Sequence, residues 1–344
     1  MFKSCKQLSQ LTFMFNNNKA YDEFLFNFAK QLSSCKNLDY LNVQFNNNYS
    51  QGSYLTDLGK SLESCLEIKT ILLQIKNNYL GNQCISDFCK SLKKCQNLMN
   101  LQLDFSRNNE ISDQFLTDLG NQIQDYNNLT ILDLDLSCNT IDTQGVMDFS
   151  VGLRECKNIS RLSLNFYDNY IQDDGATNLC QNLPKNLKDL SLKLGGNQIT
   201  QQGAIILSEA LANYKMLESF NLFINKNLIL SDGLAILARS IAQMKLLKYL
   251  TLNLTGSEIS IDGLTKLGQE LINCKNLKYF FLYVNNDLTL ALQNLVQDLS
   301  LIKNLTNLTI SISGDVRNQK YPIIFKFMKR CIRLVMIKIG FYFN

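Results

Sequence analysis

The chain has 344 residues, with 34 Lys and Arg, 30 Asp and Glu, and no His. Hydrophobic residues make up 46% and charged residues 19%, a balance that suits a folded protein and argues against intrinsic disorder. Six of the cations and no acid lie from Lys320 onward, so the first 319 residues carry 28 cations against 30 acids. Such a body lacks the basic surface that a nucleic-acid backbone requires, and no nucleic-acid partner is expected.

The N-terminal segment contains no apolar core of a secretory signal, and no apolar run approaches the 18 residues of a membrane helix. We therefore expect no membrane span and a cytoplasmic location, with the nucleus as an alternative.

An apolar frame, Leu-x-x-Leu-x-Leu-x-Leu or a conservative version of it, recurs about every 30 residues from one end of the chain to the other. Its first members are Leu8, Leu38, Ile68, Leu98, Leu129, Ile159, Leu187, Leu217, Leu247, Leu277, Leu305 and Leu334. Self-similarity at a fixed period indicates a repeat architecture. The spacing predicts about twelve stacked units in a single solenoid domain over residues 1–344.

The fifth unit shows what each repeat is expected to form. Apolar and polar residues alternate over 132–136, which indicates a strand with one buried face. Asn139 follows, and then Phe149 and Leu153, whose spacing of four places both side chains on one face of a helix. Each unit is therefore predicted to be a strand, an asparagine turn and a helix. Successive units would stack their strands into a parallel sheet with the helices on its other side.

Three further slots recur with the frame. The asparagine slot is expected to satisfy backbone groups where the strand turns away, and the glycine slot to remove bulk at the helix start or to supply an unusual dihedral. The asparagines are Asn18, Asn48, Asn78, Asn108, Asn139, Asn169, Asn197 and Asn227. The glycines are Gly145, Gly175, Gly203, Gly233 and Gly263.

The third slot, three residues before a frame leucine, holds most of the cysteines. Its cysteines are Cys5, Cys35, Cys65, Cys95, Cys156, Cys274 and Cys331. Other units place Tyr126, Pro184 or Met244 there, which favours a packing role for the thiol. The alternative is a ladder of disulfides or a metal site, since adjacent coils bring such residues within about 5 Å. A zinc site would need close cysteine pairs or histidines, so no metal and no cofactor are expected.

These residues resemble the leucine-rich repeat family, and in particular its ribonuclease-inhibitor-like members. The seventh unit carries the pattern in Leu187, Leu190, Leu192, Asn197, Ile199, Gly203, Leu207 and Leu211. The resemblance implies an α/β fold: a right-handed horseshoe with a parallel sheet on the concave side and helices on the convex side. One departure is an added residue pair, ending at Leu136 or Leu194, that is expected to lengthen each strand. The abundance of Asn, Lys, Gln, Phe and Ile is similar to that of proteins from ciliates and other AT-rich protists.

Members of this family generally bind proteins on the concave face, so the outward strand positions are the candidate site. Most of these positions are neutral and polar, with two exceptions. The aromatic exception is Phe223, Tyr249, Tyr279, Phe281 and Tyr283, on three consecutive strands. Aromatic side chains on an exposed sheet give a large contact area at low entropic cost, which favours a partner footprint; cross-strand packing is the alternative.

The acidic exception is Asp104, Asp133 and Asp135, which should lie within about 5–10 Å of one another on neighbouring strands. A solvated acidic face, a basic protein partner and a divalent cation all fit three carboxylates.

The leading functional hypothesis is a non-catalytic scaffold that binds a protein partner on its concave sheet. The alternative is a regulator such as a GTPase activator, to which one branch of the family belongs; Arg107, in the loop after a strand, would be its projecting residue. Intrinsic enzymatic activity is not expected, because the chain has no His and no recognisable nucleophile or phosphate-binding motif.

Neither end of the array reads as a polar capping unit, which favours a longer chain or end-to-end contacts between copies. The basic segment from Tyr321 to Arg333 is expected to form the last helix.

Overall fold

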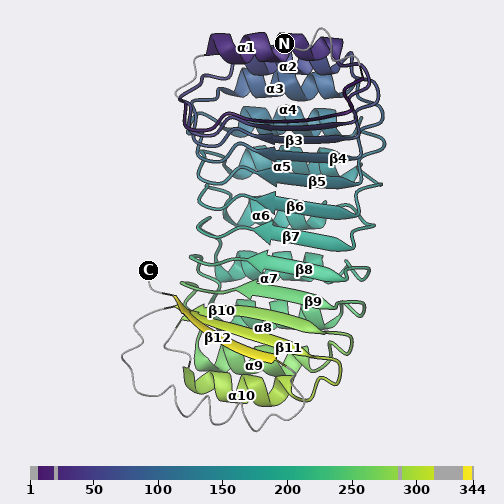
Figure 1. Cartoon of the computed structure of the whole chain (residues 1–344). Helices are drawn as coiled ribbons and strands as arrows, with labels where there is room; N and C mark the ends of the chain where they lie inside the picture. Colours follow the sequence, from purple (N-terminus) through teal and green to yellow (C-terminus); the bar gives the residue numbers. More distant parts are fainter. Residues whose placement is uncertain (1–6, 19–21, 286–288, 314–335, 343–344) are drawn as a thin grey trace. The chain divides into compact units, whose positions relative to one another are not determined.

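The computed structural model describes residues 7–18, 22–285, 289–313 and 336–342. The chain divides into two compact units: unit 1 is Met1–Tyr170 with Asn182–Asn186, and unit 2 is Ile171–Gln181 with Leu187–Asn344. In each unit, strands and helices alternate along the chain, as Figure 1 shows.

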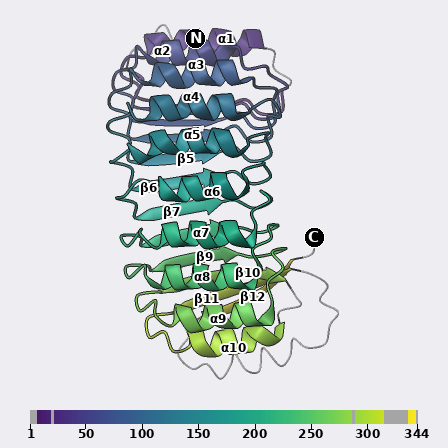
Figure 2. The same cartoon turned by 180° about the vertical axis from the view of Figure 1, so that it is seen from behind.

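Unit 1 consists of six strands alternating with five helices among its described residues. The elements are β1 (Gln10–Met14), α1 (Asp22–Gln31), β2 (Tyr40–Gln44), α2 (Tyr54–Leu62), β3 (Thr70–Gln74), α3 (Asn82–Leu92), β4 (Asn100–Asp104), α4 (Asp113–Ile123), β5 (Ile131–Asp135), α5 (Thr143–Arg154) and β6 (Arg161–Asn165). Each strand pairs in parallel with the next one in the chain, and consecutive helices contact each other in a second layer (Figure 2).

Unit 2 repeats this arrangement. Its elements are α6 (Gln172–Gln181), β7 (Asp189–Lys193), α7 (Gln201–Leu211), β8 (Ser219–Phe223), α8 (Leu230–Ala242), β9 (Tyr249–Asn253), α9 (Ile261–Leu271), β10 (Tyr279–Asn285), α10 (Thr289–Leu299), β11 (Asn307–Ser313) and β12 (Met336–Tyr342). Strands β7 to β12 are again parallel and in sequence order.

The predicted α/β repeat solenoid is therefore confirmed, with one adjustment to the repeat count. Ten strands, β1 to β10, are each followed by a described helix, so the described residues hold ten complete repeats and two further strands. The helix expected at Tyr321 to Arg333 lies outside the described residues. The single domain over residues 1–344 and the horseshoe curvature stay predictions.

The frame residues form the core, as the period-2 alternation requires. Leu134 and Leu164 in unit 1, and Leu192 and Leu222 in unit 2, each have a relative exposure of 0%. The expected longer strands are found only at β10, β11 and β12, which have seven residues, whereas β1 to β9 have five. Leu136 lies just beyond β5 but is buried, and its N–H still donates to the carbonyl of Asn165 at 2.8 Å.

The slot asparagine bridges successive coils. Asn108 Nδ2 donates to the carbonyls of Ile75, one coil earlier, and Phe105, both at 3.0 Å. Asn108 Oδ1 accepts from the backbone N–H of Asn78 at 3.1 Å, and Asn139 Oδ1 accepts from Asn108 N at 2.9 Å. The expected role in satisfying buried backbone groups is confirmed. The buried members of this ladder are Asn48, Asn78, Asn108, Asn139, Asn169, Asn197 and Asn227.

The slot glycine allows neighbouring helices to approach closely. A Cβ built on Gly145 would lie 2.7 Å from the Cα of Asp113 on the preceding helix, a distance that real Cβ atoms do not adopt. The first of the two expected roles, removal of bulk, therefore applies to Gly145.

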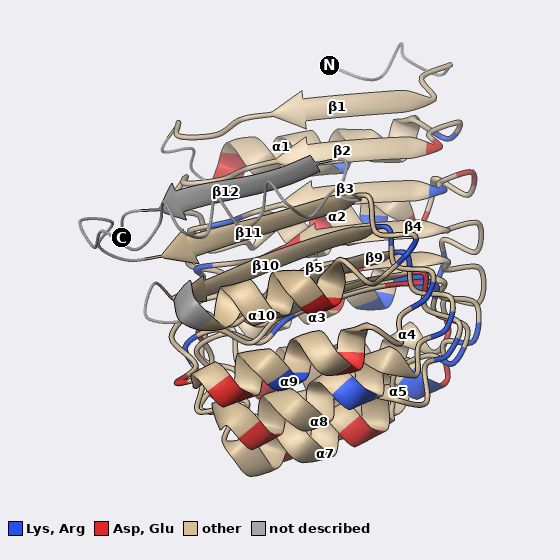
Figure 3. Cartoon of the chain, turned by 90° about the horizontal axis from the view of Figure 1, so that it is seen from below, with Lys and Arg blue, Asp and Glu red and all other residues tan. Residues whose placement is uncertain are grey.

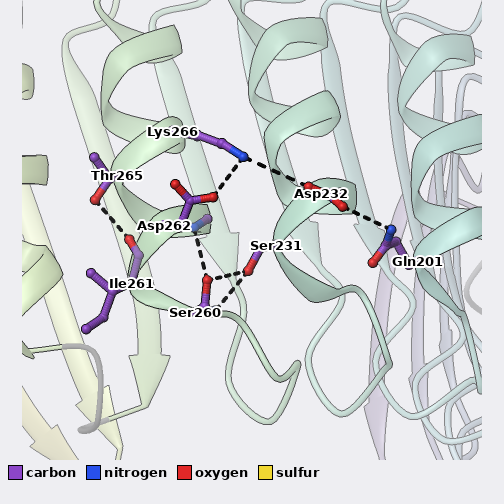
Figure 4. A network of polar contacts seen from close by, with 9 residues as sticks. Gln201, Ser231, Asp232, Ser260, Ile261, Asp262, Thr265 and Lys266 are labelled. Carbon is purple, nitrogen blue, oxygen red and sulfur yellow. Dashed lines mark hydrogen bonds and ion pairs between the residues drawn. The ribbon is translucent and has the colours of Figure 1, made fainter.

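Polar side chains also link the starts of neighbouring helices. In unit 2, the Ser231 hydroxyl accepts from the N–H of Ser260 at 3.1 Å. Lys266 Nζ lies 2.8 Å from Asp262 Oδ2 and 3.9 Å from Asp232 Oδ1 (Figure 4). These contacts join the start of α8 to the start of α9 in the helical layer. In each unit, the described helices all lie on one face of the strands (Figures 1 and 2).

Candidate interaction surface

The strand positions that alternate with the frame leucines lie on the face of the sheet away from the helices, which we call the open sheet face. In β4 to β9 the first, third and fifth residues are exposed or half-buried, whereas the second and fourth are buried. All eight side chains expected in the candidate site occupy these outward positions. The five aromatic residues belong to unit 2 and the three aspartates to unit 1.

The aromatic cluster, defined as Phe223, Tyr249, Tyr279, Phe281 and Tyr283, is brought together by the register of β8, β9 and β10. Tyr249 pairs directly with Tyr279, and their rings stack with centroids 4.7 Å apart and an interplanar angle of 10°. Phe223 and Tyr283 lie two strands apart, with ring centroids 6.2 Å apart. Asn253 on β9 is the register partner of both, so the two side chains lean towards each other across that strand.

The cluster packs across strands and still presents ring surface to solvent. Tyr249 is 46% exposed and Phe281 is 37% exposed. Cross-strand packing therefore accounts for part of the cluster but leaves aromatic area uncovered. Strand β10, which carries Phe281, pairs in parallel with β9 on one side and β11 on the other, so its backbone is fixed by hydrogen bonds.

Two lysines, which the sequence analysis did not single out, border the aromatic cluster. Lys193 Nζ lies 5.9 Å from the ring centroid of Phe223, within the range of a cation–π contact. Lys248, next to Tyr249, pairs with Glu218 at 2.6 Å between Nζ and Oε2. The repeat alignment could have shown Lys193, because it occupies the strand position of Phe223 one unit earlier.

The three aspartates also lie on neighbouring strands, as expected. Asp104 pairs in register with Asp135, and Gln102 pairs with Asp133. Asp104 Oδ1 accepts from the N–H and hydroxyl of Ser106 at 3.0 and 2.6 Å.

Asp135 makes the same local contacts with Ser137, at 3.0 and 2.7 Å, and also accepts from Asn165 Nδ2 at 2.7 Å. In unit 2, Asn253 Oδ1 takes this role towards Thr255. Two of the three carboxylates thus close the turn after their own strands, a role that does not require a charge. No group of three or more His, Cys, Asp or Glu in the described part of the chain could hold a metal ion.

Arg107 lies exposed in the loop after β4 with a left-handed backbone (φ +57°), and its N–H donates to the carbonyl of Ser137 at 2.9 Å. The residue before the slot asparagine adopts the same conformation in other repeats, for example Asn77 and Cys138. The backbone geometry of Arg107 is therefore that of the repeat.

The cysteine slot is a packing slot in the described coils. Cys65, Cys95 and Cys274 are buried free thiols, and each donates to a carbonyl 33 residues earlier, at 3.7 Å. Burial raises the pKa of Cys65 to about 11 and that of Cys95 to about 12, which disfavours the reactive thiolate. Cys5 and Cys331 lie outside the described residues.

Compared with known proteins, the chain matches no protein-family model and no curated protein sequence. Among the described helices, none combines the length and apolar character needed to cross a lipid bilayer. The functional argument therefore depends on the architecture and on the side chains that it displays.

Proposed function

We propose that this chain is a leucine-rich repeat protein of the ribonuclease-inhibitor-like type and a non-catalytic scaffold, with its partner protein bound on the open sheet face over the aromatic cluster. The observation that carries the proposal is the exposure of Tyr249 and Phe281 on strands whose backbone is already fixed by pairing on both sides. A preformed surface loses little conformational entropy on association, and Tyr is enriched among residues that dominate binding energy.

A scaffold, and not an enzyme, is supported by the chemistry available. The sequence has no His. Burial raises the pKa of the Cys65, Cys89, Cys95, Cys156 and Cys274 thiols, which disfavours nucleophilic thiolates. The aspartates on the open sheet face are engaged in turn closure at Asp104 and Asp135.

A site-specific photo-crosslinking experiment tests where the partner binds. A photoreactive phenylalanine analogue replaces Phe281 in one protein and Ile261 in another. Ile261 is 47% exposed at the start of α9, in the helical layer of the same unit, and is the matched control. We expect a protein from the source cells to crosslink at position 281 and not at 261. Equal crosslinking at both positions would contradict the proposal.

The purified partner then permits a quantitative test. We expect Tyr249→Ala combined with Phe281→Ala to weaken its affinity by about a hundredfold or more, because central aromatic residues contribute on the order of 2 kcal/mol each. The control is Leu228→Ala combined with Ile261→Ala, two side chains that are 50% and 47% exposed away from the sheet. An unchanged Kd in the aromatic variant rules out the cluster as the binding site.

A further inference from the structure

Lysines line the turns through which the chain of unit 2 passes from helix to strand. Lys215, Lys245, Lys275 and Lys303 occupy the same position in four successive turns, and all four are exposed. Lys248 and Lys278 lie three residues further on, where β9 and β10 begin. We call these six residues the lysine ridge. Figure 3 shows Lys and Arg recurring at turns where strands begin, with Asp and Glu at some of these turns and both signs of charge on the helices.

The backbone fixes the positions of the ridge lysines. Asn276 Nδ2 donates to the carbonyl of Lys245, and Asn304 Nδ2 to that of Lys275, each at 2.7 Å. At the strand starts, Lys278 N donates to the carbonyl of Lys248 at 2.9 Å. The backbones of Lys248 and Lys278 are therefore about 5 Å apart, the spacing of paired strands.

Few acidic groups neutralise the ridge. The four turn segments, 212–219, 242–249, 272–279 and 300–307, contain six lysines and one acid, Glu218, which pairs with Lys248. Within the described residues, Lys215, Lys275, Lys278 and Lys303 make no ion pair.

The repeat fold does not itself demand these lysines. A cation near a helix C-terminus is favourable, and that alone would explain one lysine per turn. The corresponding turns of unit 1, residues 33–40, 63–70, 93–100, 124–131 and 154–161, carry seven cations and five acids. Unit 1 therefore stacks its coils with cations and acids mixed at these turns, so the excess of lysines over acids at the turns of unit 2 calls for another explanation.

A pocket of about 210 Å³ lies between two ridge lysines. Lys275 and Lys303 flank it, with Ile272 and Ile302 among its lining residues, and Leu301 beside them is 59% exposed. Apolar surface between two unpaired cations suits an apolar side chain within an acidic segment.

We infer that the lysine ridge is the docking surface for an acidic segment of the protein partner, one in which single apolar side chains are spaced among carboxylates. This inference rests on the proposed function and names the chemistry of its partner. The ridge runs directly into the aromatic cluster, because Lys248 and Lys278 immediately precede Tyr249 and Tyr279. A partner lying over the rings would extend its acidic segment along the turns, where unpaired lysines supply complementary charge.

A peptide segment fits this surface better than nucleic acid does. Arginine is the side chain that matches phosphate in two-point contacts, and the ridge contains none.

A binding assay with a synthetic probe tests the ridge. The probe is a fluorescein-labelled glutamate peptide with leucine at every fourth position, measured by fluorescence anisotropy. The ridge variant carries Lys245→Gln, Lys275→Gln, Lys278→Gln and Lys303→Gln. The matched control carries Lys60→Gln, Lys90→Gln, Lys93→Gln and Lys94→Gln, with the same change in charge. These exposed lysines of unit 1 lie on α2, on α3 and in the turn after α3, and they also line a pocket.

We expect the peptide to bind the wild type, to lose about tenfold or more in affinity in the ridge variant, and to weaken as NaCl screens the charges. The control variant should bind within about twofold of wild type. Three outcomes would overturn the inference: an equal loss in the control, equal binding of a glutamine version of the peptide, or tighter binding of single-stranded DNA than of the peptide.

The partner captured by crosslinking separates this inference from the proposed function. If the ridge variant binds the partner as the wild type does while Tyr249→Ala with Phe281→Ala weakens it, the inference fails and the proposed function stands. If the aromatic variant binds the partner normally, the proposed function fails. A loss in both variants supports both.

Discussion

Asp113 and Asp142 bring two carboxyl groups together at the starts of α4 and α5. Asp113 Oδ1 accepts from the N–H of Asp142 at 2.8 Å, and Gly145 offers no side chain to keep them apart. Burial, together with the hydrogen bond to the Asp142 carboxyl, raises the pKa of Asp113 to about 6. One coil earlier, Asn82 holds the same position, accepting from the N–H and donating to the hydroxyl of Ser112, each at 3.0 Å.

We expect Asp113→Asn to stabilise the protein at pH 7 and to flatten its stability profile between pH 4 and 6. The folded pKa lies above the ordinary value of 3.8, so the folded state binds the proton more tightly than the unfolded state does. The wild-type free energy of unfolding therefore falls as the pH rises from about 4 to about 6 and then levels off. Asp113 is only half-buried, so solvent screening limits the effect to about 1 kcal/mol.

Urea denaturation at several pH values between 4 and 7 measures this profile. Glu110→Gln, which removes an exposed loop charge, is the control and should keep the wild-type profile. If Asp113→Asn and the wild type give parallel profiles, the raised pKa of Asp113 does not contribute to stability.

At the scale of the helix, α4 and α5 come into backbone contact where Gly120 faces Gly152. A Cβ on Gly152 would overlap the carbonyl oxygen of Gly120 and lie 2.9 Å from its Cα. Backbone atoms in a helix cannot turn aside as a side-chain end can. The two helices would have to separate, with loss of the packing between them.

Gly152→Ala should therefore lower the free energy of unfolding by about 3 kcal/mol, at the upper end of what overpacking costs. The control is Gly81→Ala at the start of α3, where an added Cβ would meet only the side-chain end of Glu110 at 4.0 Å. There we expect a change within about 1 kcal/mol. Equal urea midpoints for the two variants would show that α4 and α5 separate at no cost.

The same helices show how far the sequence could predict the structure. Gly145 was recognised because its slot recurs. Gly120 also lies in a recurring slot, shared with Gly59 and Gly268, but Gly152 does not, and the contact between Gly120 and Gly152 depends on how two particular helices pack. The open-face position of Tyr249 and Tyr279 followed from strand alternation, and their stacking needed the exact register. The turn-closing role of Asp104 could not be read from strand geometry, which showed only that the carboxylates are neighbours.

At the scale of the whole molecule, the apolar frame passes from unit 1 into unit 2 without a break, with a spacing of 28 residues between Ile159 and Leu187. In repeat arrays each coil is stabilised mainly by its neighbours. A frame that keeps its period predicts that stability is transmitted along the array. The prediction that residues 1–344 form a single domain therefore means that unit 1 and unit 2 unfold together.

Gly152→Ala provides the perturbation that tests this prediction, because it acts in unit 1 alone. Hydrogen exchange with mass spectrometry compares peptides from β4 in unit 1 and β9 in unit 2, with and without the substitution. If the array unfolds as one cooperative body, β9 should lose as much protection as β4, because both strands exchange through the same global opening. If β4 loses protection while β9 keeps it, the two units unfold independently, and the continuous frame then specifies two domains.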